Sequence, residues 1–153
     1  ISVANDEHFI QLRDNPMLGF AISKPFYGNA WPHPIIVLSM RYMQPSGEFG
    51  GIVACAVSIN MFSAVLSAVE IVGPSAVGTL WDKRLGLITQ YPEGQFYLAV
   101  KPSPQLRKLI MQDAPPTVYH HNRIDFNNKN RIACYRKLSQ WPLFLWGCLS
   151  RMY

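Results

Sequence analysis

Three consecutive segments decide the fold class: the stretch Ile35-Ile-Val-Leu-Ser-Met-Arg-Tyr-Met43, the turn Gln44-Pro-Ser-Gly-Glu48 and the run Gly50-Gly-Ile-Val-Ala-Cys-Ala-Val-Ser-Ile59. Both runs are rich in β-formers, and proline and glycine stand between them where a turn needs them. We therefore predict a hairpin of two long antiparallel strands. Alternation along the first strand places Ser39 and Arg41 on one face, so this face carries an arginine among apolar neighbours.

Two further hairpins and three helices are predicted along the rest of the chain. The hairpins cover residues 77–89 and 131–149, and the helices cover 5–13, 60–71 and 104–112. A strand at 20–26 follows the first helix, and Asn60 is the predicted N-cap of the second. Because strands outnumber helices and hairpins join neighbours, we predict an α+β fold of antiparallel sheets with helices on one face. The order of elements restarts near residue 72, which predicts two related units, 1–72 and 73–153.

The composition excludes several classes of protein. Of the 153 residues, 49% are hydrophobic and 15% are charged, against a usual charged share of roughly 25%, which excludes a disordered chain. The longest apolar run, residues 141–149, is shorter than the roughly 20 residues of a membrane-spanning helix. The net charge of +5 is scattered and does not alternate with aromatic residues, which argues against a nucleic-acid partner.

The three cysteines, Cys55, Cys134 and Cys148, show no metal-binding spacing. Cys55 and Cys148 lie in apolar runs, which favours buried free thiols that pack as small hydrophobic groups. A disulfide between Cys134 and Cys148 is the alternative in an oxidising compartment.

Acid–base groups gather in one place, where His120 and His121 precede Asp125 in a stretch rich in asparagine. Adjacent imidazoles point apart on a strand or a helix and make a poor metal pair, so we predict a solvated loop. Motifs for a serine hydrolase, a zinc protease or a phosphate loop do not occur in the sequence. We therefore predict a protein that is not an enzyme and that needs neither metal nor cofactor. A small hydrolase using His120 or His121 is an alternative.

Short motifs also follow one another in a characteristic order. They are Phe9, Asn15-Pro16, Ile22-Ser-Lys-Pro25, Trp31, Ser39-Met-Arg41, Gly47-Glu-Phe-Gly-Gly-Ile-Val53, Phe62, Gly78-Thr-Leu-Trp-Asp-Lys-Arg-Leu-Gly86, Tyr91-Pro92, Arg131-Ile-Ala-Cys-Tyr-Arg-Lys-Leu138 and Gln140-Trp-Pro-Leu-Phe-Leu-Trp-Gly147. This order resembles the extracytoplasmic double Cache (PAS-like) sensor domains of bacterial diguanylate cyclases with a GGDEF domain and of some sensor histidine kinases. The resemblance covers nearly the whole chain.

The resemblance implies PAS-like (Cache) antiparallel sheets flanked by helices, in two lobes. Residues 1–72 correspond to a first, membrane-distal lobe that lacks its N-terminal part, and residues 73–153 to a second, membrane-proximal lobe. Such a first lobe exposes an unpaired strand edge that can pair with another chain, so a homodimer is one expected partner. The resemblance also implies the periplasmic portion of a bacterial inner-membrane protein, tethered to the membrane in its full length.

The ligand-facing positions implied by the resemblance are Trp31, Ser39, Arg41, Ser58 and Asn60. Ser58 and Asn60 stand where relatives often carry aspartates that balance a ligand amine. Their neutrality speaks against an amine, and Arg41 then favours a small organic carboxylate, which a guanidinium grips through two hydrogen bonds. Alternatively, Arg41 is a packing residue.

These features together predict a non-catalytic sensor that passes small-molecule occupancy to a cytoplasmic diguanylate cyclase or histidine kinase. The alternative is an interaction or dimerisation module of such a receptor that binds no small molecule. The low charge and the neutral Ser58 and Asn60 favour this alternative. A closed pocket lined by Trp31, Arg41 and Ser58 distinguishes the two.

Overall fold

The chain divides into two compact units. The computed structural model describes residues 5–29, 31–73, 76–92, 101–121 and 131–150. Internal contacts separate unit 1, Ile1–Asn60, from unit 2, Met61–Tyr153. This division precedes the boundary expected at residue 72 because the segment after Asn60 packs on the second sheet. Ser63 in that segment shares a buried hydrogen bond of 3.1 Å with Thr89 of unit 2.

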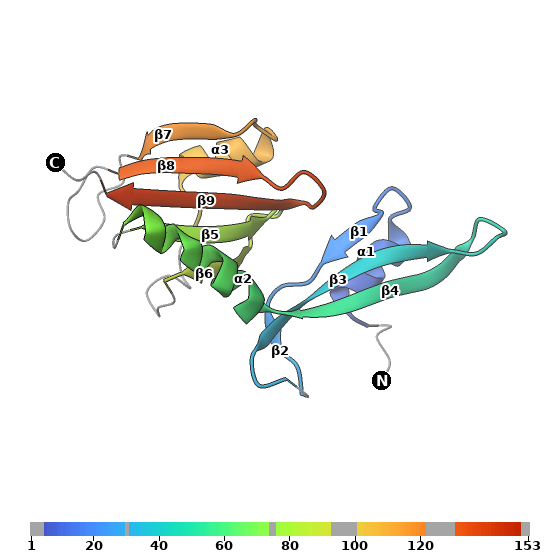
Figure 1. Ribbon diagram of the computed structural model, residues 1–153. Coiled ribbons are helices and arrows are strands. Elements are labelled where there is room, and N and C mark those ends of the chain that lie inside the picture. The colour runs from blue at the N-terminus through green and yellow to red at the C-terminus, as the bar shows by residue number, and fades with distance from the viewer. Residues whose placement is uncertain (1–4, 30, 74–75, 93–100, 122–130, 151–153) are drawn as a thin grey trace. The chain divides into compact units, whose positions relative to one another are not determined.

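Unit 1 is built around the long hairpin. Its elements are α1 (Glu7–Asp14), β1 (Phe20–Ile22), β2 (Phe26–Tyr27), β3 (Pro34–Met43) and β4 (Phe49–Ser58). The central strand is β3, which pairs antiparallel with β4 along its length and with β1 and β2 on its other edge. Figure 1 shows this hairpin as the longest feature of the unit. The predicted hairpin is therefore confirmed, with a bulge between Tyr42 and Met43.

The predicted strand at 20–26 is two short strands instead. Between them, Ser23 stays tied to β3, because Val37 N–H donates to its Oγ at 2.8 Å and Ser23 N–H donates to the Val37 carbonyl at 2.9 Å. Pro25 follows, and a proline has no N–H to donate to a ladder. The interruption is thus a local consequence of the Ser-Lys-Pro sequence.

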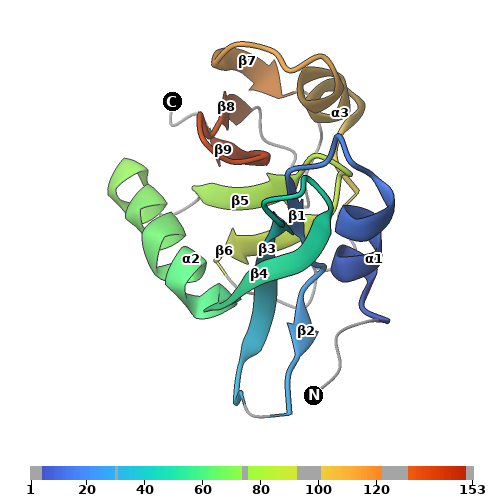
Figure 2. The same ribbon diagram turned by 90° about the vertical axis from the view of Figure 1, so that its right-hand side faces the viewer.

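Helix α1 covers one face of this sheet, as Figure 2 shows. It buries His8 and Leu12, and Phe9 meets Phe49 of β4 edge to face with ring centroids 5.8 Å apart. The helix thus packs through one side, and its exposed side carries polar and charged groups such as Glu7 and Arg13.

Unit 2 is a five-stranded antiparallel sheet with helices. Its elements are α2 (Ile59–Leu66), a 3₁₀ helix η1 (Ser67–Val72), β5 (Val77–Asp82), β6 (Leu87–Tyr91), α3 (Pro104–Met111), β7 (Thr117–His121), β8 (Arg131–Lys137) and β9 (Leu143–Ser150). The strand order is β6-β5-β9-β8-β7, so the first strand of the unit lies beside the last. This agrees with the predicted α+β class and its antiparallel sheets.

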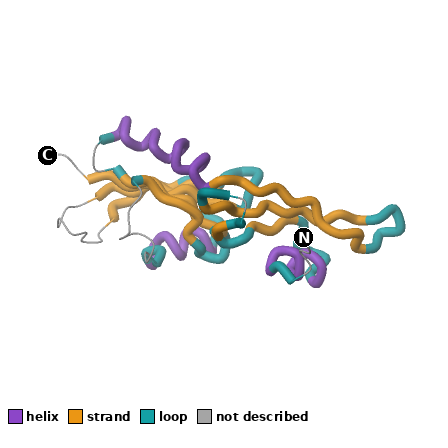
Figure 3. Tube along the Cα trace, turned by 90° about the horizontal axis from the view of Figure 1, so that it is seen from below, coloured by secondary structure: helices purple, strands orange, loops and turns teal. Residues whose placement is uncertain are grey.

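Helices flank both faces of this sheet, whereas the sequence predicted one face. On one side, α3 inserts Leu106 and Ile110 into a core with Trp81, Tyr135 and Phe144. Helix α2 lies on the other side, because its Ser63 is hydrogen-bonded to Thr89, which stands opposite Leu80. Leu80 is the neighbour of Trp81 along β5, so the side chains of Leu80 and Thr89 point to the face opposite to that of Trp81. Figure 3 shows these two helices on opposite sides of the strands.

Two local predictions were wrong. The N-cap of α2 is Ser58, whose Oγ accepts from the Asn60 N–H at 3.3 Å; Asn60 lies within the first turn. His120 and His121 belong to the edge strand β7 and not to a loop, because alternate residues Val118 and His120 are exposed while Tyr119 is buried. Asp125 lies outside the described residues.

The cysteines are free thiols, of which only Cys148 is buried, while Cys55 and Cys134 are exposed. The strand register rules out the alternative disulfide in this fold. Cys134 stands opposite Gly147, and Cys148 opposite Ala133. Their side chains therefore point to opposite faces of the sheet.

Candidate functional site

The face of the unit 1 sheet that α1 covers carries three of the five predicted site residues. We call it the α1 face. Directly opposed residues of an antiparallel pair share a face, and the register opposes Ser39 to Ala54, Arg41 to Ile52 and Ser58 to Ile35. The side chains of Ser39, Arg41 and Ser58 therefore lie on the same surface, as alternation in the sequence predicts for the first two.

Arg41 is bound to the end of α1. Its Nη1 donates to the carbonyl of Leu12 and, at 3.5 and 3.4 Å, to those of Arg13 and Asn15. Its guanidinium carbon also lies 4.8 Å from the centre of the Phe49 ring. The last carbonyls of a helix have no partners within the helix and favour a cation. Arg41 therefore anchors α1 to the sheet, which supports its interpretation as a packing residue.

Ser39 lies beneath the surface. Its side chain is fully buried, and its Oγ has no hydrogen-bond partner among the described residues. An unsatisfied buried hydroxyl costs about 1–3 kcal/mol. Ser39 offers no exposed surface to a ligand in this conformation.

Ser58 and the remaining two predicted residues, Trp31 and Asn60, lie at the end of the hairpin opposite to Arg41. The Trp31 ring lies against Gly28 and near Ile35, since a Cβ placed on Gly28 would come within 3.1 Å of Trp31 Cδ1 and 3.3 Å of Ile35 Cδ1. Ile35 is opposed to Ser58, and Ser58 binds the backbone of Asn60. We call Trp31, Ile35, Ser58 and Asn60 the Trp31 end.

The five predicted residues thus form two groups. Arg41 is six positions beyond Ile35 along β3, a separation of about 20 Å at 3.4 Å per residue. A small ligand that touches Trp31 does not reach Arg41. The closed pocket expected between Trp31, Arg41 and Ser58 is therefore not formed.

The Trp31 end is accessible and polar. Trp31 is 45% exposed and Asn60 is exposed, while Ser58 is half-buried. An indole N–H, a hydroxyl and a carboxamide supply hydrogen-bond donors beside an apolar ring. Such a mixture suits a small organic molecule with acceptor oxygens.

The histidine pair carries no such arrangement. His120 is exposed on the edge strand β7, and His121 is the last residue of that strand. Among the described residues, no three histidine, cysteine, aspartate or glutamate side chains group as metal ligands would. None of the described helices combines the length and hydropathy that crossing a membrane requires.

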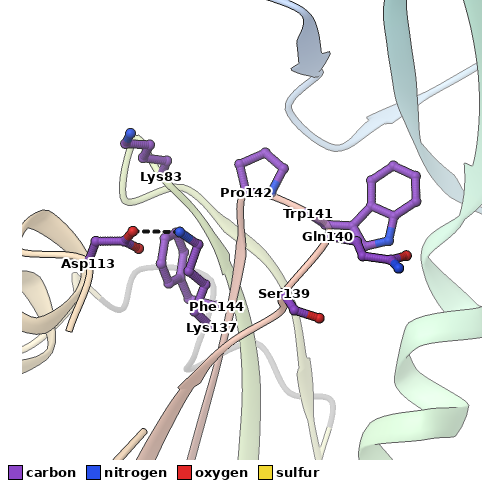
Figure 4. A pocket seen from close by; sticks show the side chains of 8 residues that line it. All are labelled: Lys83, Asp113, Lys137, Ser139, Gln140, Trp141, Pro142 and Phe144. Atoms are coloured by element: carbon purple, nitrogen blue, oxygen red, sulfur yellow. Dashed lines mark hydrogen bonds and ion pairs between the residues drawn. The ribbon is translucent and has the colours of Figure 1, made fainter. Parts of the chain in front are cut away.

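Sequence reasoning missed a cavity of about 230 Å³ in unit 2. Figure 4 shows its lining, which is Lys83, Asp113, Lys137, Ser139, Gln140, Trp141, Pro142 and Phe144. These residues come from three separate places: the β5–β6 turn, the segment after α3 and the β8–β9 hairpin. The proline-containing turn was visible in the sequence, but its neighbours across the sheet were not.

The fold is shared with solved sensor domains. Neither a protein-family model nor a curated protein sequence matches the chain. The extracellular domain of the histidine-kinase candidate rpHK1S-Z16 is similar, with a TM-score of 0.75 and 19% identity over 99% of this chain and 61% of that one. The periplasmic sensory domain of the Campylobacter jejuni chemoreceptor Tlp1 has a TM-score of 0.69 and 10% identity over 97% and 56%.

The sensory domain of the chemoreceptor Tlp3 from the same organism, with isoleucine bound, gives a TM-score of 0.57 and 10% identity over 98% and 56% of the two chains. The chain thus spans less than two thirds of the length of each of these structures. The neighbours are sensory and not catalytic domains. Across both of its units, the chain has the α+β fold of extracellular and periplasmic sensor domains.

Proposed function

We propose that the chain is an extracytoplasmic ligand-sensing domain of a bacterial transmembrane signalling protein. Small-molecule occupancy would bias the packing of the domain and thereby a cytoplasmic output domain, a histidine kinase or a diguanylate cyclase. The observation that carries the proposal is the similarity of fold along nearly all of the chain to sensor domains of histidine kinases and chemoreceptors. The diguanylate cyclase output rests on the resemblance in sequence alone.

The proposed binding site is the Trp31 end, and the proposed ligand is a small carboxylate. A carboxylate only accepts hydrogen bonds, and Trp31, Ser58 and Asn60 all carry donors. Isoleucine, which is bound in the Tlp3 domain, carries such a carboxylate, together with an ammonium group. Arg41 has no part in this site, because it lies about 20 Å along β3 from Ile35 and its guanidinium is hydrogen-bonded to the end of α1.

A thermal-shift screen of amino acids, small carboxylates and amines tests the proposal. At about a hundred times its Kd, a ligand stabilises the folded state by about 2.7 kcal/mol, which raises Tm by roughly 5–10 °C in a chain of this size. The Trp31→Ala variant should lose this shift. Tyr42→Ala is the control, since this exposed aromatic residue (51%, against 45% for Trp31) lies on β3 seven positions beyond Ile35.

Two outcomes would contradict the proposal. In the first, no compound of any class stabilises the wild-type protein. In the second, the shift caused by every stabilising compound survives in Trp31→Ala.

A second candidate is an interaction module that binds no small molecule and forms a homodimer. The observation that favours it is the outer edge of β4, which pairs with no described strand and carries no charged residue along Phe49–Ser58. Val53 in this strand is 67% exposed. Light scattering over a range of concentrations would reveal the dimer, and Val53→Lys should dissociate it because a charge blocks edge pairing. A monomer at all concentrations contradicts this candidate.

A further inference from the structure

The cavity in unit 2 has the make-up of a ligand site separate from the Trp31 end. Its walls hold two ammonium groups and one carboxylate, together with the indole of Trp141 and the rings of Pro142 and Phe144. Ligand sites typically combine such apolar walls with a few converging polar groups. At about 230 Å³, the cavity is smaller than the usual 300–1,000 Å³, so it suits a compound about the size of one aromatic ring with a single polar group.

Hydrogen bonds hold the three segments of the lining in place. The buried carboxylate of Asp82 fixes the turn that carries Lys83, accepting from the Arg84 N–H at 2.9 Å and the Gly86 N–H at 2.7 Å. Lys137 Nζ binds Asp113 Oδ2 at 2.6 Å and so links β8 to the end of α3. The cavity is therefore preorganised, which lowers the entropic cost of binding.

The floor of the cavity is part of the core of unit 2. Phe144 is buried and stacks on Tyr135, with centroids 5.9 Å apart and an interplanar angle of 16°. Burial, and to a smaller extent the nearby charge of Asp113, raises the pKa of the Tyr135 phenol. The apolar floor thus lies directly beside the charged wall.

The charges of the lining select an anion. Lys137 is neutralised by Asp113, whereas Lys83 forms no hydrogen bond or ion pair with a described residue. The lining therefore has a net charge of +1. In Figure 4 the two lysines lie on one side of the cavity and Trp141 on the other, so an anionic group and an apolar group would meet different walls.

We infer that this cavity binds a small organic carboxylate with an apolar ring or branch. The carboxylate lies at Lys83 and shares Lys137 with Asp113, and the apolar part rests on Phe144 and Pro142 beside the Trp141 indole. The inference concerns unit 2 alone and does not depend on a ligand at the Trp31 end.

Titration of ¹⁵N-labelled protein with benzoate and with benzamide tests the inference. The two probes have nearly the same shape and differ in charge. The indole N–H signal of Trp141, assigned with a Trp141→Phe variant, reports occupancy. We expect benzoate to shift this signal saturably and to bind about tenfold more tightly than benzamide, since each exposed ion pair contributes up to about fivefold.

Lys83→Gln should weaken benzoate binding about three- to fivefold. The control Lys101→Gln removes the same charge from an exposed lysine that does not line the cavity, and it should leave binding unchanged. Added salt should weaken benzoate and leave benzamide unaffected.

Any of three results overturns the inference. They are equal affinity for benzamide, equal loss in the two lysine variants, and no saturable shift of Trp141 up to the solubility limit of benzoate. A two-dimensional spectrum of each variant shows that it is folded. None of these three results bears on the proposal that a ligand binds near Trp31, because that site lies in unit 1.

Discussion

Replacement of Arg41 by alanine should detach the C-terminal end of α1 from the sheet of unit 1. The guanidinium makes its hydrogen bonds to the carbonyls that close this helix, and it lies over Phe49. A charged hydrogen bond contributes about 1.5–3 kcal/mol, a cation at a helix terminus about 0.3–1 kcal/mol, and a cation–π contact about 0.5–1 kcal/mol.

We expect Arg41→Ala to destabilise unit 1 by about 2–4 kcal/mol, with the long bonds to Arg13 and Asn15 adding little. Hydrogen–deuterium exchange of the α1 amides measures this loss locally, since exchange speeds up by about tenfold for each 1.4 kcal/mol. Arg41→Lys should recover part of the stability, because it keeps the charge but not the planar fork.

Arg13→Ala is the matched control. Arg13 is also an arginine near the end of α1, but its partner is the exposed side chain of Asp14, so exchange of the helix should not change. The reasoning fails if Arg41→Ala leaves exchange of α1 unchanged, or if it abolishes ligand stabilisation without affecting the helix. The second result would return Arg41 to the ligand site.

Two further predictions concern unit 2, and a third concerns the cysteines of both units. Tyr135→Phe should be neutral or stabilising at pH 7, since the buried phenol has no partner among the described residues. Burial raises the pKa of Tyr135, so the wild type should lose stability above about pH 10 and the variant less, as urea unfolding at several pH values will show. Ser103→Ala removes the side chain that caps α3 and should cost about 1 kcal/mol in the same assay. Thiol labelling should modify Cys55 and Cys134 rapidly and Cys148 only on unfolding, and a reductant should leave Tm unchanged.

The hairpins could be predicted from the sequence because their signals are local. The turn Gln44-Pro-Ser-Gly-Glu48 lies between two runs of strand-forming residues, and the structure pairs those runs with a single bulge. The end of a unit is not a local property. Residues 61–72 have the composition of a helix, but no pattern within them shows that they pack on the strand that contains Thr89.

The candidate site shows the same limit. Alternation correctly placed Ser39 and Arg41 on one face, and the resemblance in sequence directed attention to Trp31. Arg41 lies six positions along β3 from Ile35 of the Trp31 end, and the acceptors for its guanidinium come from the end of a helix some 26–29 residues earlier in the chain. The polar residues His120 and His121 led to the prediction of a loop where the structure has an edge strand. The cavity of unit 2 was not predicted, because its lining comes from three segments that meet only in the folded sheet.

The central claim, that a small carboxylate binds at the Trp31 end, is tested most directly by NMR of the indole N–H groups. The four tryptophans give four such signals, of which only that of Trp31 belongs to unit 1. During titration with the compounds that raise Tm, at least one should shift the Trp31 signal saturably, while those of the buried Trp81 and half-buried Trp146 stay in place. If every compound that stabilises the protein leaves the Trp31 signal unmoved, the claim is contradicted.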